Sequence, residues 1–430
     1  ILVASYGYWV YKKKKNDVSA SQDFFLAEGS LTWWAIGASL IASNISAEQF
    51  IGMSGEGFFV GTAVAAYEWI AALALIIIAV WFIPIYLKNK IYTMPQFLKT
   101  RYNESVSLVM AIFWLFLYVF VNLTSILYLG AVAINGLLGG EYLHVVMVGL
   151  MVMALFITLG GMKVIGFTDV IQVAVLIIGG FATVYMALQI VDQRINGVVD
   201  GSAIAGFKTL LAQAPEHFKM IIPRPTATSS QLEINKYLTF PGLMSYLAGI
   251  WIINLNYWGC NQYITQRALG ADLQTARTGI LFAGMLKLLM PVIVMLPGIA
   301  AFVLYKNGQL PGFEGGKDGA YSAILGFLPS GLKGLAIAAL TAAIVASLAG
   351  KLNSIGTIFT LDIYMKYFKK KSPVQSAGGE AFTSLEKDAH KEGEEKNMVW
   401  VGRMVALVAI VLAVIFEWKD LLGIGGRSEE

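Results

Sequence analysis

Long apolar segments separated by short polar ones dominate the pattern along the chain. A run of roughly 20 apolar residues forms a helix long enough to cross about 30 Å of hydrocarbon. Helices are expected because every backbone group in lipid must be hydrogen-bonded within its own segment. After the remnant of a helix at 1–11, the pattern predicts complete spans at 33–58, 62–87, 105–136, 143–160, 167–191, 240–266, 278–305, 330–367 and 398–416.

Two of these spans contain polar residues at a depth where lipid-facing helices carry few. The first complete span holds "ASNISAEQFIGMSGEG" at 42–57, and the span that follows the long polar loop holds "INLNYWGCNQY" at 253–263. Such residues are tolerated where they face a water-filled cavity, or where a helix is broken and its free carbonyls bind an ion. An alternative is that they only hold neighbouring helices together.

The two interrupted spans each begin a series of about five helices, which predicts an inverted five-helix repeat around a central site. We expect the organisation to be a helix remnant at 1–11, a first repeat at 33–191, an external loop at 192–239 with a short helix near 202–213, a second repeat at 240–416 that lacks its last helix, a cytoplasmic linker at 369–397 and a truncated tail at 417–430.

Composition confirms the membrane class and excludes a soluble protein. The chain is 57% hydrophobic and only 13% charged, which is too little charge to coat a soluble protein of 430 residues. The net charge of +4 does not indicate a nucleic-acid partner, because basic residues in short loops are typical of the cytoplasmic side. On this basis the loops with Lys12–15, Lys88, Lys90, Lys99, Arg101, Lys163, Arg267, Arg277 and Lys369–371 are predicted to be cytoplasmic.

No motif of a metal site, a phosphate-binding loop or a hydrolase triad is found in the sequence, so an enzyme is not expected. The histidines lie at a helix start and in two polar loops, and we expect His144, His217 and His390 to be surface residues. The single cysteine, Cys260, cannot form an internal disulfide.

Four motifs in order identify a resemblance to the solute:sodium symporter family, most closely to its sodium/galactose or sodium/glucose type. They are "SAEQFIGMSG" at 46–55, "GGMKVIGFTDVIQ" at 160–172, "NYWGCNQYITQR" at 256–267 and "LNSIGTIFTLDIY" at 352–364. The resemblance implies an all-α, LeuT-like membrane fold with a discontinuous first helix in each repeat. It also implies sodium-driven import of a neutral sugar by alternating access in the bacterial inner membrane. Family members continue through further helices, so we expect the chain to be truncated at both ends.

A sugar site needs carboxylate, amide and ammonium groups for the ring hydroxyls and an aromatic ring for the apolar face. The spans contain these residue types, and by resemblance the sugar ligands are Gln49, Glu68, Asn254, Tyr257 and Lys287. The resemblance assigns gating roles to Met53, Tyr67 and Tyr257, the last of them as inner gate. Glu68 and Lys287 could instead form a structural ion pair, although burying two charges for packing alone is rarely favourable. Ala71 stands where the galactose type has a serine, so one hydroxyl contact is missing.

Sodium prefers oxygen ligands, which the carbonyls of a broken helix can supply. By resemblance, the sodium ligands are the carbonyls of Ala42, Ile45 and Ala343 and the hydroxyl of Ser347, while relatives carry a second serine where this chain has Ala346. Asp169 is expected to guide sodium toward the cytoplasm, with a helix N-terminal cap as the alternative.

The expected partners are therefore sodium, a small neutral sugar and the lipid bilayer, without nucleic acid, and the pattern leaves the oligomeric state open. Two other functions share this sequence pattern. The chain could carry another small organic solute with sodium, or it could be the solute-sensing membrane domain of a signalling protein. An anionic solute is disfavoured because no arginine is expected in mid-span.

Overall fold

The computed structural model describes residues 2–12, 20–27, 29–138, 140–313, 316–368 and 384–417. Within this part of the chain the regular structure is all helical, without a strand, which confirms the predicted all-α class. Seven helical segments there are long and apolar enough to cross a membrane. The shorter apolar helix Leu143–Thr158 and the broken first helix account for the remaining predicted spans.

The helices follow the predicted order along the chain. The first half contains α1 (Leu2–Lys12), α2 (Ala20–Leu26), α3 (Trp33–Asn44), α4 (Ala47–Phe59), η1 (Thr62–Ala65), α5 (Ala66–Ile77), η2 (Ile78–Phe82), α6 (Ile83–Lys88), α7 (Met94–Arg101), α8 (Glu104–Leu117), η3 (Tyr118–Leu123), α9 (Thr124–Leu137), α10 (Leu143–Thr158) and α11 (Gly161–Asn196). The second half contains α12 (Ala203–Gln213), η4 (Pro215–Phe218), α13 (Gln231–Thr239), α14 (Gly242–Met244), η5 (Ser245–Gly249), α15 (Ile250–Cys260), α16 (Gln262–Leu269), α17 (Leu273–Lys306), η6 (Lys317–Gly319), α18 (Ala320–Gly326), α19 (Ser330–Ile358), η7 (Phe359–Phe368) and α21 (Ser384–Glu417).

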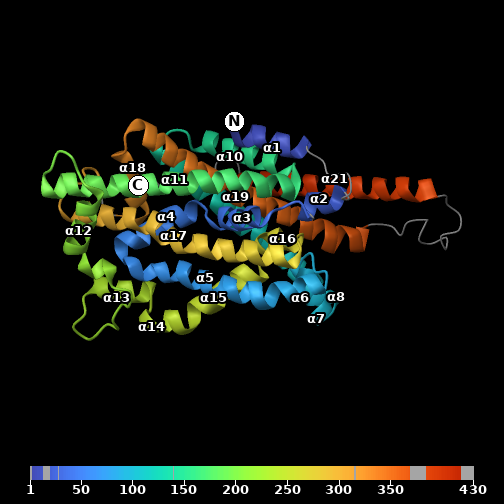
Figure 1. The fold of residues 1–430 in the computed structure, drawn as a ribbon, viewed down its shortest axis with the longest axis horizontal. Coiled ribbons are helices and arrows are strands. Elements are labelled where there is room, and N and C mark those ends of the chain that lie inside the picture. The colour runs from blue at the N-terminus through green and yellow to red at the C-terminus, as the bar shows by residue number, and fades with distance from the viewer. Residues whose placement is uncertain are drawn as a thin grey trace.

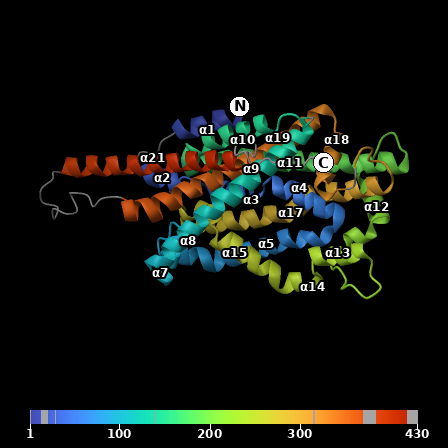
Figure 2. The same ribbon diagram turned by 180° about the vertical axis from the view of Figure 1, so that it is seen from behind.

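The long helices lie side by side along the longest axis of the molecule (Figure 1). Helices α12, α13 and α14 gather at one end, and α7 lies at the opposite end, as the reverse view also shows (Figure 2). The basic loop around α6 and α7 is therefore opposite to the predicted external loop, as the charge pattern requires. Helix α21 begins at Ser384, inside the segment expected to be a polar linker, and 369–383 and 418–430 lie outside the described residues.

Both predicted helix breaks are present. Between α3 and α4 the backbone is extended, with Ile45 at φ −81° and ψ 112° and Ser46 at φ −119° and ψ −179°. Between α15 and α16 the extended residue is Asn261, at φ −90° and ψ 123°. A helix that ends inside the membrane leaves backbone groups without intrahelical partners, which makes them available to ligands. The discontinuous first helix of each repeat is thus confirmed.

The broken helices are held by long neighbours. Helix α17 packs against α3, α4 and α5, while α11 packs against α3, α17 and α19. Because α19 also contacts both α3 and α16, it touches the two broken helices near their interruptions. This arrangement places the predicted ligands of all these helices around one centre.

The C-terminal end of α4 is covered by the turn η4, which contains His217. The ring of His217 is only 2% exposed, with Nε2 2.9 Å from the carbonyl oxygen of Phe58 and its centroid 3.9 Å from that of Phe302. Gly61, at φ 100°, allows this approach, because a Cβ there would lie 2.3 Å from the His217 carbonyl oxygen. The expectation of a surface histidine is wrong here, since a polar loop pattern does not reveal that the loop folds back onto a helix end.

This burial predicts a pH-dependent stability. Burial, reinforced by the charge of Lys236, lowers the pKa of His217 to about 4, whereas in the unfolded chain the ring titrates near pH 6.5. The contribution to stability is therefore complete above about pH 6.5 and is lost as the pH falls toward 4. At about pH 5, we expect protonation of His217 to lower the free energy of unfolding by about 2 kcal/mol.

Thermal unfolding of the purified protein in detergent, at about pH 7.5 and about pH 5, measures this effect. His217→Gln keeps a hydrogen-bond donor for the Phe58 carbonyl but cannot titrate, so its melting temperature should fall less on acidification. An equal fall in both proteins would show that other groups cause the acid sensitivity.

Candidate substrate and ion site

A cavity of about 560 Å³ lies between the two broken helices, within the size range of small-molecule sites. Its lining comes from both helix breaks and from α5, α8, α17 and α19, which are far apart in the sequence. All the residues predicted to bind or enclose the substrate line this one cavity: Gln49, Met53, Tyr67, Glu68, Asn254, Tyr257 and Lys287. The structure thus brings the predicted substrate and gate residues together.

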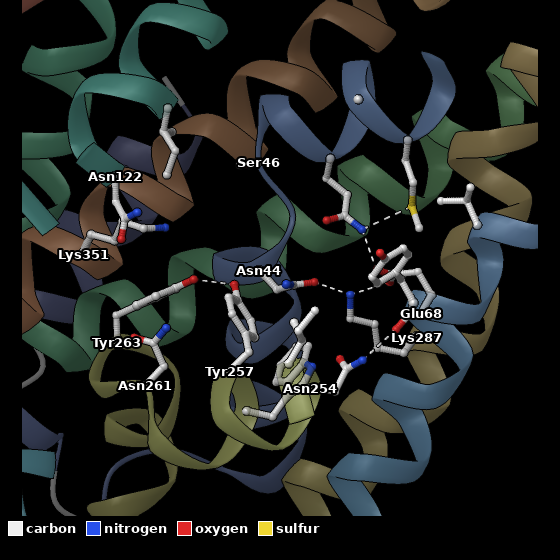
Figure 3. Close-up of a pocket in the computed structure, with 18 of the residues that line it drawn as sticks. Asn44, Ser46, Glu68, Asn122, Asn254, Tyr257, Asn261, Tyr263, Lys287 and Lys351 are labelled. Carbon is white, nitrogen blue, oxygen red and sulfur yellow. Dashed lines mark hydrogen bonds and ion pairs between the residues drawn. The ribbon is translucent and has the colours of Figure 1, made fainter. Parts of the chain in front are cut away.

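The polar wall of the cavity is built around Glu68 and Lys287, as Figure 3 shows. Lys287 Nζ pairs with Glu68 Oε2 and also donates a hydrogen bond to Asn44 Oδ1. Gln49 Nε2 donates to Glu68 Oε1 at 2.6 Å. Lys287 Nζ also lies 5.2 Å from the centroid of the Trp258 ring. These groups come from five helices, and Asn44 and Gln49 lie on either side of the break after α3, so the network connects both sides of that break.

The chemistry of this wall suits a ligand with several hydroxyl groups. A hydroxyl both donates and accepts, and the wall offers carboxylate and amide oxygens next to ammonium and amide N–H donors. Glu68 and Lys287 are 5% and 1% exposed, so their charges are compensated by each other and by the neighbouring amides. A ligand that replaces these contacts gains strong, directional hydrogen bonds.

The outer part of the cavity contains the predicted cover. Gln49 Nε2 lies 3.4 Å from Met53 Sδ, and the Tyr67 ring packs edge-on against Phe240 with centroids 5.7 Å apart. Asn254 Nδ2 donates to the Tyr67 carbonyl at 3.3 Å. The cover is therefore connected through hydrogen bonds to the polar wall of the same cavity.

The inner part of the cavity is aromatic. Tyr263 donates its hydroxyl hydrogen to the Tyr257 hydroxyl, and the two rings meet edge to face with centroids 5.9 Å apart. Tyr257 also packs edge-on against Trp258, 5.3 Å between centroids. The hydroxyl of Tyr257 is thus held by protein, which leaves its ring as the part that can contact a ligand.

The predicted ion ligands lie on α19 and at the end of α3, and these two segments are in contact. The Oγ of Ser347, on α19, donates to the carbonyl oxygen of Ser43 at 3.2 Å, and Ser43 lies between Ala42 and Ile45 at the end of α3. Ala343 is buried one turn before Ser347. Ser43 Oγ is buried and makes no hydrogen bond within the described part of the chain. Such a set of hydroxyl and carbonyl oxygens fits a sodium ion.

A fully buried ion pair lies next to these residues. Arg267 Nη2 is 3.7 Å from Asp169 Oδ2, both side chains are 0% exposed, and Arg267 Nε donates to Ser39 Oγ at 2.7 Å. Ser39 in turn donates to Asp169 Oδ2. Gly350 leaves room for the guanidinium, because a Cβ there would lie 2.4 Å from Arg267 Nη2 and 3.1 Å from Ser43 Oγ.

Two sequence-based expectations about this pair are wrong. Asp169 is not a helix cap, since α11 begins at Gly161, two turns earlier. Arg267 is not an exposed loop residue but is buried in α16, since its charge is balanced by Asp169. Its guanidinium does not line the cavity, so it makes no arginine site for an anionic substrate there.

Several lining residues were not predicted. Among them are Asn44, Trp258, Asn261, Tyr263 and Lys351. Asn44 and Asn261 lie in the two polar motifs, so the helix breaks themselves could have indicated them. The sequence also indicated Lys351 by itself, because a lysine within the span 330–367 is energetically costly in a membrane and such residues usually have a functional role.

Comparison with known proteins agrees with this geometry. Residues 24–421 match the profile of the sodium:solute symporter family. A sodium/glucose cotransporter of Vibrio parahaemolyticus is 42% identical over 427 residues, and the match covers 96% of this chain and 72% of that protein. The sodium/myo-inositol cotransporter 2 of Mus musculus is 33% identical over 380 residues, covering 85% of this chain and 55% of the relative.

A solved structure shares the fold. It is a Na⁺-coupled sialic acid symporter in a substrate-bound, outward-open state, with a TM-score of 0.78 and 23% identity. The match covers 99% of this chain and 80% of that chain. The similarity confirms the LeuT-like fold predicted from the sequence.

Proposed function

Since the chain belongs to the sodium:solute symporter family, we propose that it imports a neutral sugar together with sodium by alternating access across a bacterial plasma membrane. The observation that carries the proposal is the cavity between the two broken helices, with a hydrogen-bonding wall on one side and the Tyr257 ring on another. The Vibrio relative, a sodium/glucose cotransporter, supports both the substrate class and the bacterial membrane.

The charges of the cavity support a neutral substrate. The two carboxylates that line it are each paired. Glu68 pairs with Lys287, and Glu56 Oε1 lies 2.7 Å from Lys317 Nζ, so neither pair adds net charge to the site. An anionic solute would need excess positive charge at the site. A cyclic polyol is the second candidate, because it shows the same ring of hydroxyls and because sodium/myo-inositol cotransporters are among the relatives.

In this proposal the polar wall binds the ring hydroxyls and Tyr257 closes the inner side against the apolar face of the sugar. Met53 and Tyr67 cover the outer side. Sodium is held by oxygens of Ser347 and of the segment that ends α3, so its binding joins α19 to α3. Asp169 attracts the ion as it leaves toward the cytoplasm, and the Arg267 contact keeps that carboxylate in place.

Uptake of labelled solutes by proteoliposomes that contain the full-length protein tests the substrate class. The panel contains glucose, galactose, myo-inositol and sialic acid, each with an inward sodium gradient and with sodium replaced by choline. We expect sodium-dependent uptake of a neutral sugar or of myo-inositol, and none of sialic acid. Uptake of sialic acid alone, or binding of a sugar without any uptake, would contradict a sugar symporter, and the second result would favour a sensor.

A prediction for Tyr257 separates its ring from its hydroxyl. Tyr257→Phe keeps the ring, so we expect the half-saturating sugar concentration to change less than about threefold. Tyr257→Ala should raise it about fivefold or more, roughly 1 kcal/mol, because the stacking surface is lost. Both are measured by sugar titration of uptake. An equal loss in the two variants would indicate that the hydroxyl, rather than the ring, binds substrate.

A further inference from the structure

Lys351 lies beside the predicted ion site and has no role in the function proposed so far. It is on α19, four residues after Ser347, and its residue surface is 4% exposed. Lysines within membrane spans are rare and tend to mark ion or substrate pathways, because a buried ammonium group loses its hydration.

The ammonium group contacts the same hydroxyl that is predicted to bind sodium. Lys351 Nζ donates to Ser347 Oγ at 3.1 Å, and that Oγ donates to the Ser43 carbonyl at 3.2 Å. On its other side Nζ lies 4.0 Å from the centroid of the Tyr263 ring, a cation–π contact. The cation of this side chain therefore lies where oxygens and an aromatic face already suit a monovalent cation.

We propose that the Lys351 ammonium is a tethered cation that competes with sodium for Ser347, so that sodium binds only as the ammonium moves away. The proposal rests on the sodium-coupled function above. A sodium ion on the same Oγ would lie within about 6 Å of Nζ, where the repulsion of two unit charges corresponds to roughly a hundredfold weaker binding. Movement of the flexible lysine side chain reduces this penalty but does not remove it.

The substrate cavity provides space for the displaced ammonium group. Lys351 lines the substrate cavity, on the side opposite to Glu68 and Lys287 (Figure 3). When the Lys351 ammonium leaves Ser347, its contact with the Tyr263 ring changes as well. The Tyr263 hydroxyl in turn donates to Tyr257. Lys351 thus connects the ion site to the predicted inner gate through a continuous series of contacts. Sodium occupancy is coupled to the gate through this lysine in addition to the helix contact made by Ser347.

The test is direct binding of radioactive sodium to the purified full-length protein. Lys351→Met removes the charge and keeps an unbranched side chain, and Lys351→Gln keeps a hydrogen-bond donor for Ser347. We expect both variants to lower the Kd for sodium at least tenfold, while Lys351→Arg leaves it near the parent value. The matched control is Lys333→Met, the same change in the first turn of α19, about 20 Å from Ser347 along the helix.

The outcomes separate this proposal from the function on which it rests. A lower Kd in Lys351→Met or Lys351→Gln, but not in Lys333→Met, supports the tethered cation. A parent that binds sodium with the same Kd as both uncharged variants overturns the role of Lys351 and leaves the sodium-coupled function in place. If neither the parent nor the variants bind sodium, the sodium-coupled function and the tethered cation both fall.

Discussion

Glu68→Ala and Lys287→Ala are each expected to reduce sugar affinity more than a hundredfold. Each change removes one member of a buried hydrogen-bonded set and leaves the other charge unpaired in the cavity wall. Loss of a partner of this kind costs about 3 kcal/mol or more, which corresponds to this factor in affinity. The measurement is sugar uptake by proteoliposomes, together with equilibrium sugar binding to the detergent-solubilised protein.

Breaking a buried pair can also weaken the fold, so two further variants accompany these. Glu68→Gln keeps the volume and one hydrogen-bond acceptor, and its thermal stability should stay closer to that of the parent. The control is Glu216→Ala, which removes the carboxylate of an exposed pair, 2.8 Å from Lys219, and should change uptake little. Uptake within twofold of the parent in both Glu68→Ala and Lys287→Ala would reject the substrate site proposed here.

Ser347→Ala is expected to raise the sodium concentration for half-maximal uptake at least tenfold, about 1.4 kcal/mol. The change removes one ligand oxygen from a site where the preceding residue, Ala346, offers no hydroxyl. Sodium stabilises one conformation over another only by the difference between its binding free energies for the two. A weaker sodium site therefore lowers the coupling free energy by the same amount. Sugar binding at saturating sodium should be largely kept. Sodium titration of uptake, parent against variant, measures the effect.

Ser347→Thr is the control for this change, because it keeps a hydroxyl at the same position. The titration is repeated in the Lys351→Met background, where the competing ammonium is absent. Any change in the half-maximal sodium concentration there comes only from the loss of the Ser347 oxygen. An unchanged sodium curve for Ser347→Ala in both backgrounds would show that the ion binds elsewhere. The assignment of the break after Asn44 to ion binding would then be wrong.

The sequence was sufficient to predict the helices, the two breaks and seven of the 21 residues that line the substrate cavity. Apolar length determines a membrane helix, and polar residues in mid-span are tolerated only at a cavity or a break. For this reason Gln49 and Asn254 could be assigned to one centre before any coordinates were known.

The residues that were misjudged depend on tertiary contacts. Arg267 follows a polar motif and was predicted to be a loop residue. It is fully buried because Asp169, on a helix far away in the sequence, balances its charge. His217 lies in a polar loop that folds back onto the end of α4. Lys351 is 88 positions away in the sequence from its aromatic partner Tyr263. Helical periodicity places such residues on a helix but does not indicate which distant side chain will meet them.

In the proposed function, the cavity couples the import of a neutral sugar to the entry of sodium. Proteoliposomes with the full-length protein are given an inward sodium gradient and labelled sugar at equal concentration on both sides. We predict that the sugar accumulates inside above the external concentration, and that the accumulation disappears when sodium is equal on both sides. An internal sugar concentration that stays at the external value, with or without the gradient, would contradict sodium-coupled import.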